Sequence, residues 1–201
     1  MDARLFRSIN HFADHTQWAH GVAKAYANYG IVVVGLLLLA AWWDARSAEN
    51  PTAAVSAIAW AGAAAIIGVG LVQLIGGAID RARPTTVLHG THLLLDKTAD
   101  FSFPSDHSTA MGAVAVGLLL AGPLLRRRWY GWAALSFTLL MMFDRVYVGA
   151  HYPGDVVGGL ALGALVAAAL GPIGRWPFRR IAELVASTPL RPVVAVSRPS
   201  G

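Results

Sequence analysis

Cysteine is absent from this 201-residue sequence, and charged residues are scarce. Without cysteine the chain has neither disulfides nor thiol chemistry, and its composition leaves the redox state of its compartment open. Charged residues make up 13% of the chain and hydrophobic residues 56%, whereas soluble domains carry roughly a quarter charged residues. This deficit excludes an ordinary soluble domain. The formal net charge of +5 does not indicate nucleic-acid binding, because most arginines lie beside apolar runs, where they set topology and meet lipid headgroups.

The sequence instead has apolar runs long enough to cross a bilayer. Spanning helices are predicted at about residues 28–43, 52–79, 105–125, 129–148 and 154–173. Residues 3–25 place apolar side chains at helical spacing among polar ones, which predicts an amphipathic helix in the membrane interface. The predicted fold class is all-α, a polytopic membrane helical bundle of about five transmembrane helices plus an N-terminal amphipathic helix. We expect a membrane-embedded domain at 1–175 and an amphipathic, then disordered, tail at 176–201.

Two polar clusters lie at residues 101–108 and 144–155, separated by two apolar runs and the basic turn at 126–128. Two membrane-length helices joined by a short turn fold back as a hairpin, so both clusters are expected at the same membrane face. Such an apolar chain has no structural need for an arginine, two histidines and two aspartates at one level. The clusters therefore predict an active site.

Three short motifs occur in order along the chain: Arg83-Pro84, then Pro104-Ser105-Asp106-His107 in the first cluster, then Arg145, His151 and Asp155 in the second. They resemble the type 2 phosphatidic-acid phosphatase superfamily, whose pattern is K-x6-R-P, P-S-G-H and S-R-x5-H-x3-D. P-S-D-H followed by Y-V-G-x-H-Y-P is similar to the bacitracin-resistance branch, undecaprenyl-pyrophosphate phosphatases that recycle the cell-wall carrier lipid. The resemblance implies a membrane helical bundle and a phosphohydrolase.

Three positions depart from the family pattern. Gly76 stands where the family has lysine, and either Arg81 or Lys97 could supply the missing cation. Asp106 replaces the glycine of P-S-G-H; its simplest interpretation is a charge in the first turn of a helix, and the alternative is that it tunes His107. Asp144 replaces the serine before the third-motif arginine, and it could either accept a hydrogen bond from that arginine or line the site.

Phosphoryl transfer needs cations around the phosphate oxygens, a nucleophile and an acid for the leaving oxygen. Arg83 and Arg145 have planar forks that fit phosphate, and a helix beginning at Ser105 adds an anion site and a hydroxyl donor. His151 and Asp155 are one helical turn apart if the last spanning helix begins early, so the carboxylate would hold one imidazole nitrogen and free the other to attack. The family resemblance implies a phosphohistidine, with His107 as general acid.

No metal and no cofactor are required by this scheme, since arginines and a helix end neutralise the charge. His89, His92 and Asp96 are interpreted as solvated loop residues because their spacing is uneven. The expected partners are a polyprenyl or other lipid phosphate and the bilayer, not nucleic acid, and the oligomeric state is left open. Alternative functions are a phosphatidic-acid, phosphatidylglycerophosphate or decaprenyl-phosphoryl-sugar phosphatase, a vanadate-binding oxidoreductase, and a non-enzymatic transporter or scaffold.

The distribution of Lys and Arg predicts the orientation. Five spans would place nine of these residues on the side of the basic turn and seven on the other, or five once Arg83 and Arg145 are assigned to the site. By the positive-inside rule, we expect the protein to lie in the cytoplasmic membrane with its site on the extracytoplasmic side.

Overall fold

A computed structural model describes residues 1–96 and 100–196 of the chain, and within these ranges the regular structure is helical. The α-helices are α1 (Asp2–Asp14), α2 (His20–Ala45), α3 (Pro51–Ile79), α4 (Pro84–Val87), α5 (Asp106–Ala121), α6 (Trp129–Tyr147), α7 (Pro153–Ala169) and α8 (Gly171–Ala186). Three short 3-10 turns are η1 (Gln17–Ala19), η2 (Gly122–Leu124) and η3 (Arg191–Val193). The predicted all-α class is confirmed.

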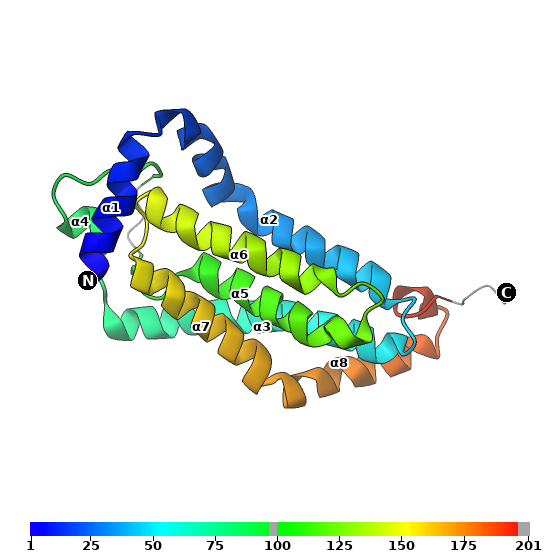
Figure 1. Cartoon of the computed structure of the whole chain (residues 1–201). Helices are drawn as coiled ribbons and strands as arrows, with labels where there is room; N and C mark the ends of the chain where they lie inside the picture. Colours follow the sequence, from blue (N-terminus) through cyan, green and yellow to red (C-terminus); the bar gives the residue numbers. More distant parts are fainter. Residues whose placement is uncertain (97–99, 197–201) are drawn as a thin grey trace.

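Helix α5 lies at the centre of the bundle, packed against α3, α6 and α7 (Figure 1). Small residues allow this close packing. A Cβ atom at Gly117 would lie 2.5 Å from the Cβ of Ala61 on α3, and one at Gly163 on α7 would lie 2.2 Å from the carbonyl oxygen of Thr109 on α5. These glycines are therefore needed for helix contact.

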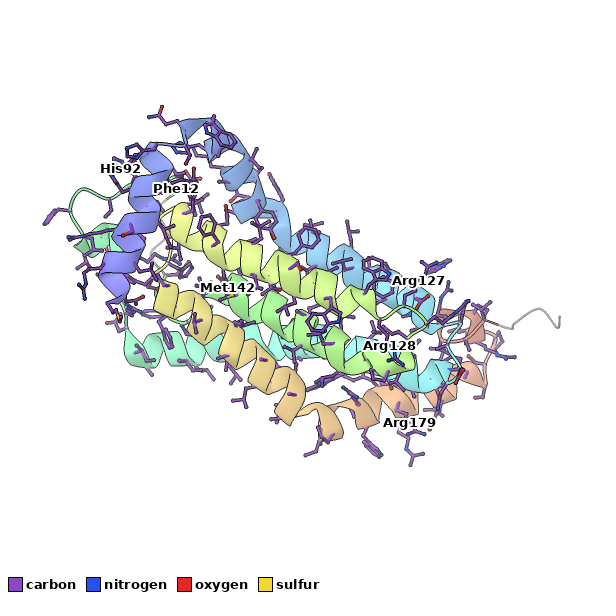
Figure 2. All side chains as sticks on the ribbon, in the orientation of Figure 1. Phe12, His92, Arg127, Arg128, Met142 and Arg179 are labelled. Carbon is purple, nitrogen blue, oxygen red and sulfur yellow. The ribbon has the colours of Figure 1, made fainter. Side chains whose placement is uncertain are left out.

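The expected hairpin is present, with α5 and α6 antiparallel (Figure 1). The basic turn, including Arg127 and Arg128, lies at one end of the bundle, and α1 lies across the other end together with His92 (Figure 2). The two polar clusters consequently meet at the end that α1 covers.

Three helices within the described ranges are long and apolar enough to cross a membrane: residues 17–45, 51–87 and 106–124. Helices α7 and α8 would make a fourth span only as a bent pair, because their axes differ by 60°. Helix α6 is not among the helices that are long and apolar enough. Length and hydropathy therefore give three or four spans rather than the predicted five, and the exact number is not fixed. The last predicted span, 154–173, is interrupted at Leu170, and Pro172 occupies the first turn of α8, where proline is tolerated.

The N-terminal segment is two helices rather than the single one predicted for residues 3–25. Helix α1 ends at Asp14, and α2 begins at His20, earlier than the predicted start near residue 28. Thr16 separates them: its hydroxyl lies 2.9 Å from the carbonyl of Phe12 and 2.7 Å from the hydroxyl of Tyr147. Such local side-chain bonds compete with continued helix.

Residues 187–196, where the sequence predicts disorder, lie against the end of α2. The backbone N–H of Val196 donates to the carbonyl of Arg46, and Arg46 Nη1 donates to the carbonyl of Pro192, each at 2.9 Å. The rest of the predicted disordered tail, residues 197–201, lies outside the described residues.

Candidate active site

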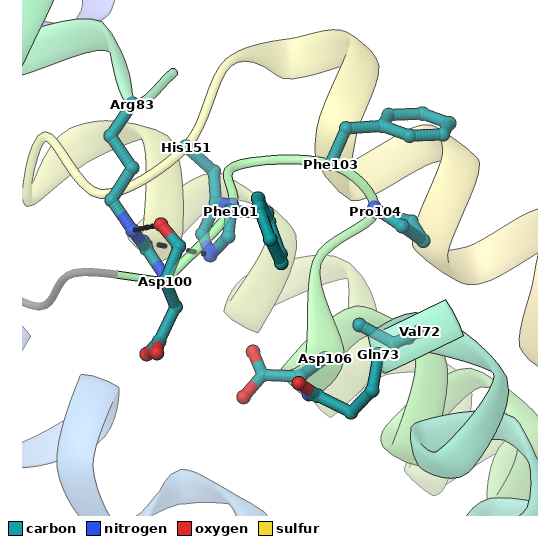
Figure 3. A pocket seen from close by; sticks show the side chains of 9 residues that line it. All are labelled: Val72, Gln73, Arg83, Asp100, Phe101, Phe103, Pro104, Asp106 and His151. Atoms are coloured by element: carbon teal, nitrogen blue, oxygen red, sulfur yellow. Dashed lines mark hydrogen bonds between the residues drawn. The ribbon is translucent and has the colours of Figure 1, made fainter. Parts of the chain in front are cut away.

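A cavity of about 40 Å³ opens at the α1 end of the bundle (Figure 3). Its lining comes from the end of α3, the segments on either side of residues 97–99, the start of α5 and the loop between α6 and α7: Val72, Gln73, Arg83, Asp100, Phe101, Phe103, Pro104, Asp106 and His151. Three of the predicted site residues, Arg83, Asp106 and His151, thus share one cavity although they are far apart in the sequence.

His151 lies in the loop between α6 and α7 and is 1% exposed. Its Nδ1 is 2.8 Å from the carbonyl oxygen of Ser102. Because a carbonyl only accepts, Nδ1 carries the hydrogen and Nε2 keeps its lone pair. Nε2 is 3.4 Å from Arg83 Nη1 (Figure 3). Burial lowers the pKa of His151, and the positive charges of Arg145 and Arg83 lower it further, so the ring is neutral at pH 7, as a nucleophile requires.

Asp155 is fully buried in the first turn of α7. Its Oδ2 accepts from the Ser102 hydroxyl at 2.5 Å and from the Tyr152 backbone N–H at 2.8 Å. The carboxylate is 3.8 Å from His151 Nδ1, so the direct hydrogen bond predicted from the four-residue spacing is not formed. The reason is local: Tyr152 precedes Pro153 and is extended, with ψ 156°, since a residue before proline avoids the helical region. The helix therefore begins after His151.

Ser102 connects the two residues, and sequence reasoning missed it. It is fully buried, its carbonyl accepts a hydrogen bond from His151 Nδ1 and its hydroxyl donates one to Asp155. Ser102 belongs to the first polar cluster, but nothing in its spacing marks it. Gln73 was missed as well. Gln73 lines the cavity from α3. It could have been predicted from the sequence, because it is the one amide side chain in the apolar run 57–79.

Arg83 and Arg145 line a second cavity, of about 120 Å³. Arg83 donates from Nε to the carbonyl of Asp100 at 3.1 Å and from Nη1 to that of Ala150 at 3.0 Å. Arg145, in the last turn of α6, is 7% exposed, and its Nε has no hydrogen-bond partner among the described residues. A buried cation without a partner is costly, so this guanidinium is suited to an anionic ligand.

Asp106 and His107 form a pair in the first turn of α5. Asp106 Oδ1 is 2.9 Å from His107 Nδ1 and also accepts from the His107 backbone N–H at 2.8 Å. This contact fits the interpretation that Asp106 tunes His107. His107 itself does not line the cavity in which Asp106 and His151 meet, and its side chain is 23% exposed.

Ser105 is the N-cap of α5 and is fully buried. Its hydroxyl oxygen accepts from the Ser108 N–H at 3.5 Å, and it donates no hydrogen bond within the described part of the chain. Two of the first N–H groups of α5 are thus bound by Asp106 and Ser105 rather than free. The anion site predicted at this helix end is partly occupied by the protein's own side chains.

Arg81, one candidate to replace the family lysine, is bound to two carboxylates in the structure. Its Nη1 donates to Asp155 Oδ1 and its Nη2 to Asp2 Oδ2, both at 2.6 Å, and it lines neither cavity described above. The other candidate, Lys97, lies outside the described residues. At position 76 itself a Cβ would lie 3.1 Å from the ring of Phe101. The Phe101 ring therefore lies where a lysine side chain would begin.

The remaining polar residues lie elsewhere. Asp144 is 5% exposed and lines an apolar cavity of about 410 Å³ between α1, α2 and α6. It accepts no hydrogen bond from Arg145 in the described structure.

The loop histidine His92 lies away from the site, with its Nε2 3.6 Å from Asp14. Across residues 1–96 and 100–196, no three His, Asp or Glu side chains cluster closely enough to hold a metal ion.

Comparison with known proteins identifies the family to which this helical fold and its buried cluster of histidine, arginine and aspartate belong. Residues 57–178 match the PAP2 superfamily, and the chain belongs to that family. It is 34% identical over 166 residues to the undecaprenyl-diphosphatase BcrC of Bacillus subtilis (strain 168), covering 83% of this chain and 80% of the relative. It is 30% identical over 165 residues to the putative undecaprenyl-diphosphatase YbjG of Escherichia coli (strain K12), covering 82% and 78%.

The crystal structure of LpxE from Aquifex aeolicus has the same fold, with a TM-score of 0.61 and 20% identity over 84% of this chain and 93% of that one. The family predicted from the motifs is confirmed, and with it the class of membrane lipid phosphatase.

Proposed function

We propose that this protein removes the terminal phosphate of a lipid pyrophosphate, converting undecaprenyl pyrophosphate to undecaprenyl phosphate and inorganic phosphate. Family membership and the undecaprenyl-diphosphatase names of two curated relatives support this substrate. The observation that best supports the phosphatase reaction is the environment of His151. This residue is buried, its Nδ1 is bound to the Ser102 carbonyl, and its Nε2 lone pair is 3.4 Å from the phosphate-binding candidate Arg83.

In the proposed reaction, the terminal phosphate is bound by Arg83, which lines both cavities, and by Arg145, which lines the second. Guanidinium groups match the phosphate oxygens. Nε2 of His151 attacks the phosphorus, and the bond to the bridging oxygen of the lipid phosphate breaks. The positive charge that develops on the ring is stabilised by the Ser102 carbonyl at Nδ1 and by Asp155 beyond it. Ser105 has an unused hydroxyl proton to offer the phosphate.

His107 supplies the proton that the departing lipid phosphate takes. Asp106 binds Nδ1 of His107, so the acidic proton is on Nε2, the nitrogen left for the substrate. The neutral His107 then takes a proton from water, which attacks the phosphohistidine and releases inorganic phosphate. Arginines neutralise the charge, and no step calls on a metal ion.

We place this site at the extracytoplasmic face of the cytoplasmic membrane. The arginines of the basic turn and Arg179 of α8 lie at the end of the bundle opposite α1 and the site (Figure 2). The positive-inside rule assigns the basic end to the cytoplasm.

The test is a substrate panel on the purified protein. Phosphate release is measured from undecaprenyl pyrophosphate, phosphatidylglycerophosphate, phosphatidic acid and a decaprenyl-phosphoryl sugar, with and without a chelator, and with His151→Ala as control. The proposal predicts the highest kcat/KM for the pyrophosphate, full activity in chelator and loss of turnover in His151→Ala. Preference for a phosphomonoester would reassign the substrate, and a strict need for divalent metal or for vanadate would contradict the mechanism. Undiminished function with both histidines replaced would indicate a scaffold or transporter.

A further inference from the structure

Arg81 is held by a network that leads away from the cavity. Its two terminal nitrogens donate to Asp155 and Asp2 at 2.6 Å each, and its guanidinium carbon is 4.1 Å from the centre of the Tyr152 ring. Asp155 is fully buried, whereas the side chains of Arg81 and Asp2 are 32% and 31% exposed. Both ends of the guanidinium fork are therefore bound to carboxylates, and its face covers an aromatic ring.

Asp2 connects α1 to the start of α7 in a second way. Its Oδ1 accepts from the backbone N–H of Gly154 at 2.9 Å, and a carboxylate at a helix N-terminus is favourable. One side chain of α1 thus bonds both to the loop after α3 and to the helix that carries Asp155.

The network reaches the nucleophile through Ser102. The backbone N–H of Ser102 donates to the Arg81 carbonyl at 2.8 Å, its hydroxyl donates to Asp155, and its carbonyl accepts from His151 Nδ1. The order of contacts is Asp2, Arg81, Asp155, Ser102 and His151. Three of these, Asp155, Ser102 and His151, are buried, so each has little freedom to move independently of its neighbours.

We infer that Arg81 is a positioning residue that couples docking of α1 to alignment of the His151 ring, by bridging Asp2 to the Asp155 carboxylate. The inference rests on the proposed function, because it assumes that His151 is the nucleophile. In metal sites, groups that orient a ligating histidine from the second layer typically affect affinity or activity about 10–100-fold, and we expect a similar range for Arg81.

Helix α1 has other attachments, which make the bridge testable by itself. Phe6 is 0% exposed, with its ring centre 5.6 Å from that of Tyr152. The Asn10 side chain donates to the carbonyl of His92 at 2.8 Å and accepts from its N–H at 2.9 Å. Replacement of Asp2 by asparagine therefore weakens the bridge without releasing the helix.

The experiment measures kcat and KM on undecaprenyl pyrophosphate in micelles for Arg81→Met, Arg81→Lys, Asp2→Asn and the Asp2→Asn/Arg81→Met double variant. Arg179→Met is the matched control, since among residues 1–96 and 100–196 Arg179 pairs with Glu183 alone, on the exposed face of α8. We expect Arg81→Met to lower kcat about 10–100-fold while KM stays within about twofold, because Arg81 does not touch the substrate. Lysine, which can reach one carboxylate but not bridge two, gives an intermediate kcat.

Asp2→Asn alone should lower kcat and should have no further effect when Arg81 is already methionine. The inference is overturned if Arg81→Met raises KM with kcat unchanged, which would make Arg81 a direct phosphate ligand. It is also overturned if Arg81→Met behaves as Arg179→Met, or if Asp2→Asn has the same effect in both backgrounds. Should Arg81→Met fail to fold, Arg81→Lys and Asp2→Asn decide by the same kcat and KM criteria. A failure confined to these variants leaves the proposed function standing, whereas an active His151→Ala overturns both.

Discussion

The two ring nitrogens of His151 have different surroundings, and this difference fits the proposed role of His151 as the nucleophile. Nδ1 is fixed by the Ser102 carbonyl, and Nε2 lies beside Arg83 at the cavity. A charged imidazole would be disfavoured there, since the ring is buried and the positive charges of Arg145 and Arg83 are nearby. The reactive form is thus the one that the site stabilises before substrate arrives.

The pH dependence of kcat/KM should report this environment. Because burial and the neighbouring arginines lower the pKa of His151 below its ordinary value of 6.5, the neutral form persists below that pH. Activity should therefore be retained at pH 6.5 and lost only as the pH falls further. Arg83→Met removes one of the charges that lower the pKa, so the acid limb should move to higher pH. A profile of log kcat/KM against pH for both proteins measures this, and a limb at or above 6.5 in the unmodified protein would contradict it.

Asp106 offers a second test at this scale. If it orients His107, Asp106→Gly, which restores the family residue, should lower kcat by at least about tenfold, part of the roughly 10²–10⁴ that general acid catalysis contributes. Asp106→Asn keeps an acceptor for Nδ1 and should lose less. Steady-state kinetics decide between this and the simpler interpretation as a first-turn helix charge, for which glycine and asparagine would both leave kcat unchanged.

At the scale of the elements, the motifs and apolar runs in the sequence sufficed to predict the family, the helical class and the hairpin that brings the two clusters together. The sequence did not reveal the ends of helices where a single residue decides them. Pro153 delays the start of α7 and so separates His151 from the helix that carries Asp155. Thr16 separates α1 from α2. Ser102 and Arg81 could not be assigned from spacing because their roles depend on contacts between loops far apart in the chain.

Helix packing around α5 gives a prediction about stability. Gly163→Ala would place a Cβ 2.2 Å from the Thr109 carbonyl, so α7 must move, and overpacking of this kind costs typically about 1–3 kcal/mol. Gly70→Ala is the matched control, since nothing lies within 4 Å of a Cβ built there. We expect a lower midpoint of thermal unfolding in detergent for Gly163→Ala only. Equal midpoints for the two variants would show that α5 and α7 are not packed this closely.

For the whole molecule, α1 and the candidate site lie at one end of the bundle and the arginine-rich turn at the other (Figure 2), and we propose that these ends face opposite sides of the membrane. Because the chain has no cysteine, single cysteines can report this orientation without a background signal. A cysteine replacing Arg127 should react with a membrane-impermeant thiol reagent only after the membrane is opened. One replacing Thr86, near the site, should react in intact cells. The reverse pattern would invert the proposed topology.

The central claim is that His151 carries the phosphate during turnover. The most direct measurement is to mix the protein with undecaprenyl pyrophosphate labelled in its terminal phosphate, quench during turnover and map the label by peptide. The account predicts an acid-labile phosphoryl group on His151 that is absent from His151→Ala. Normal turnover by His151→Ala, or label on another residue, would contradict it.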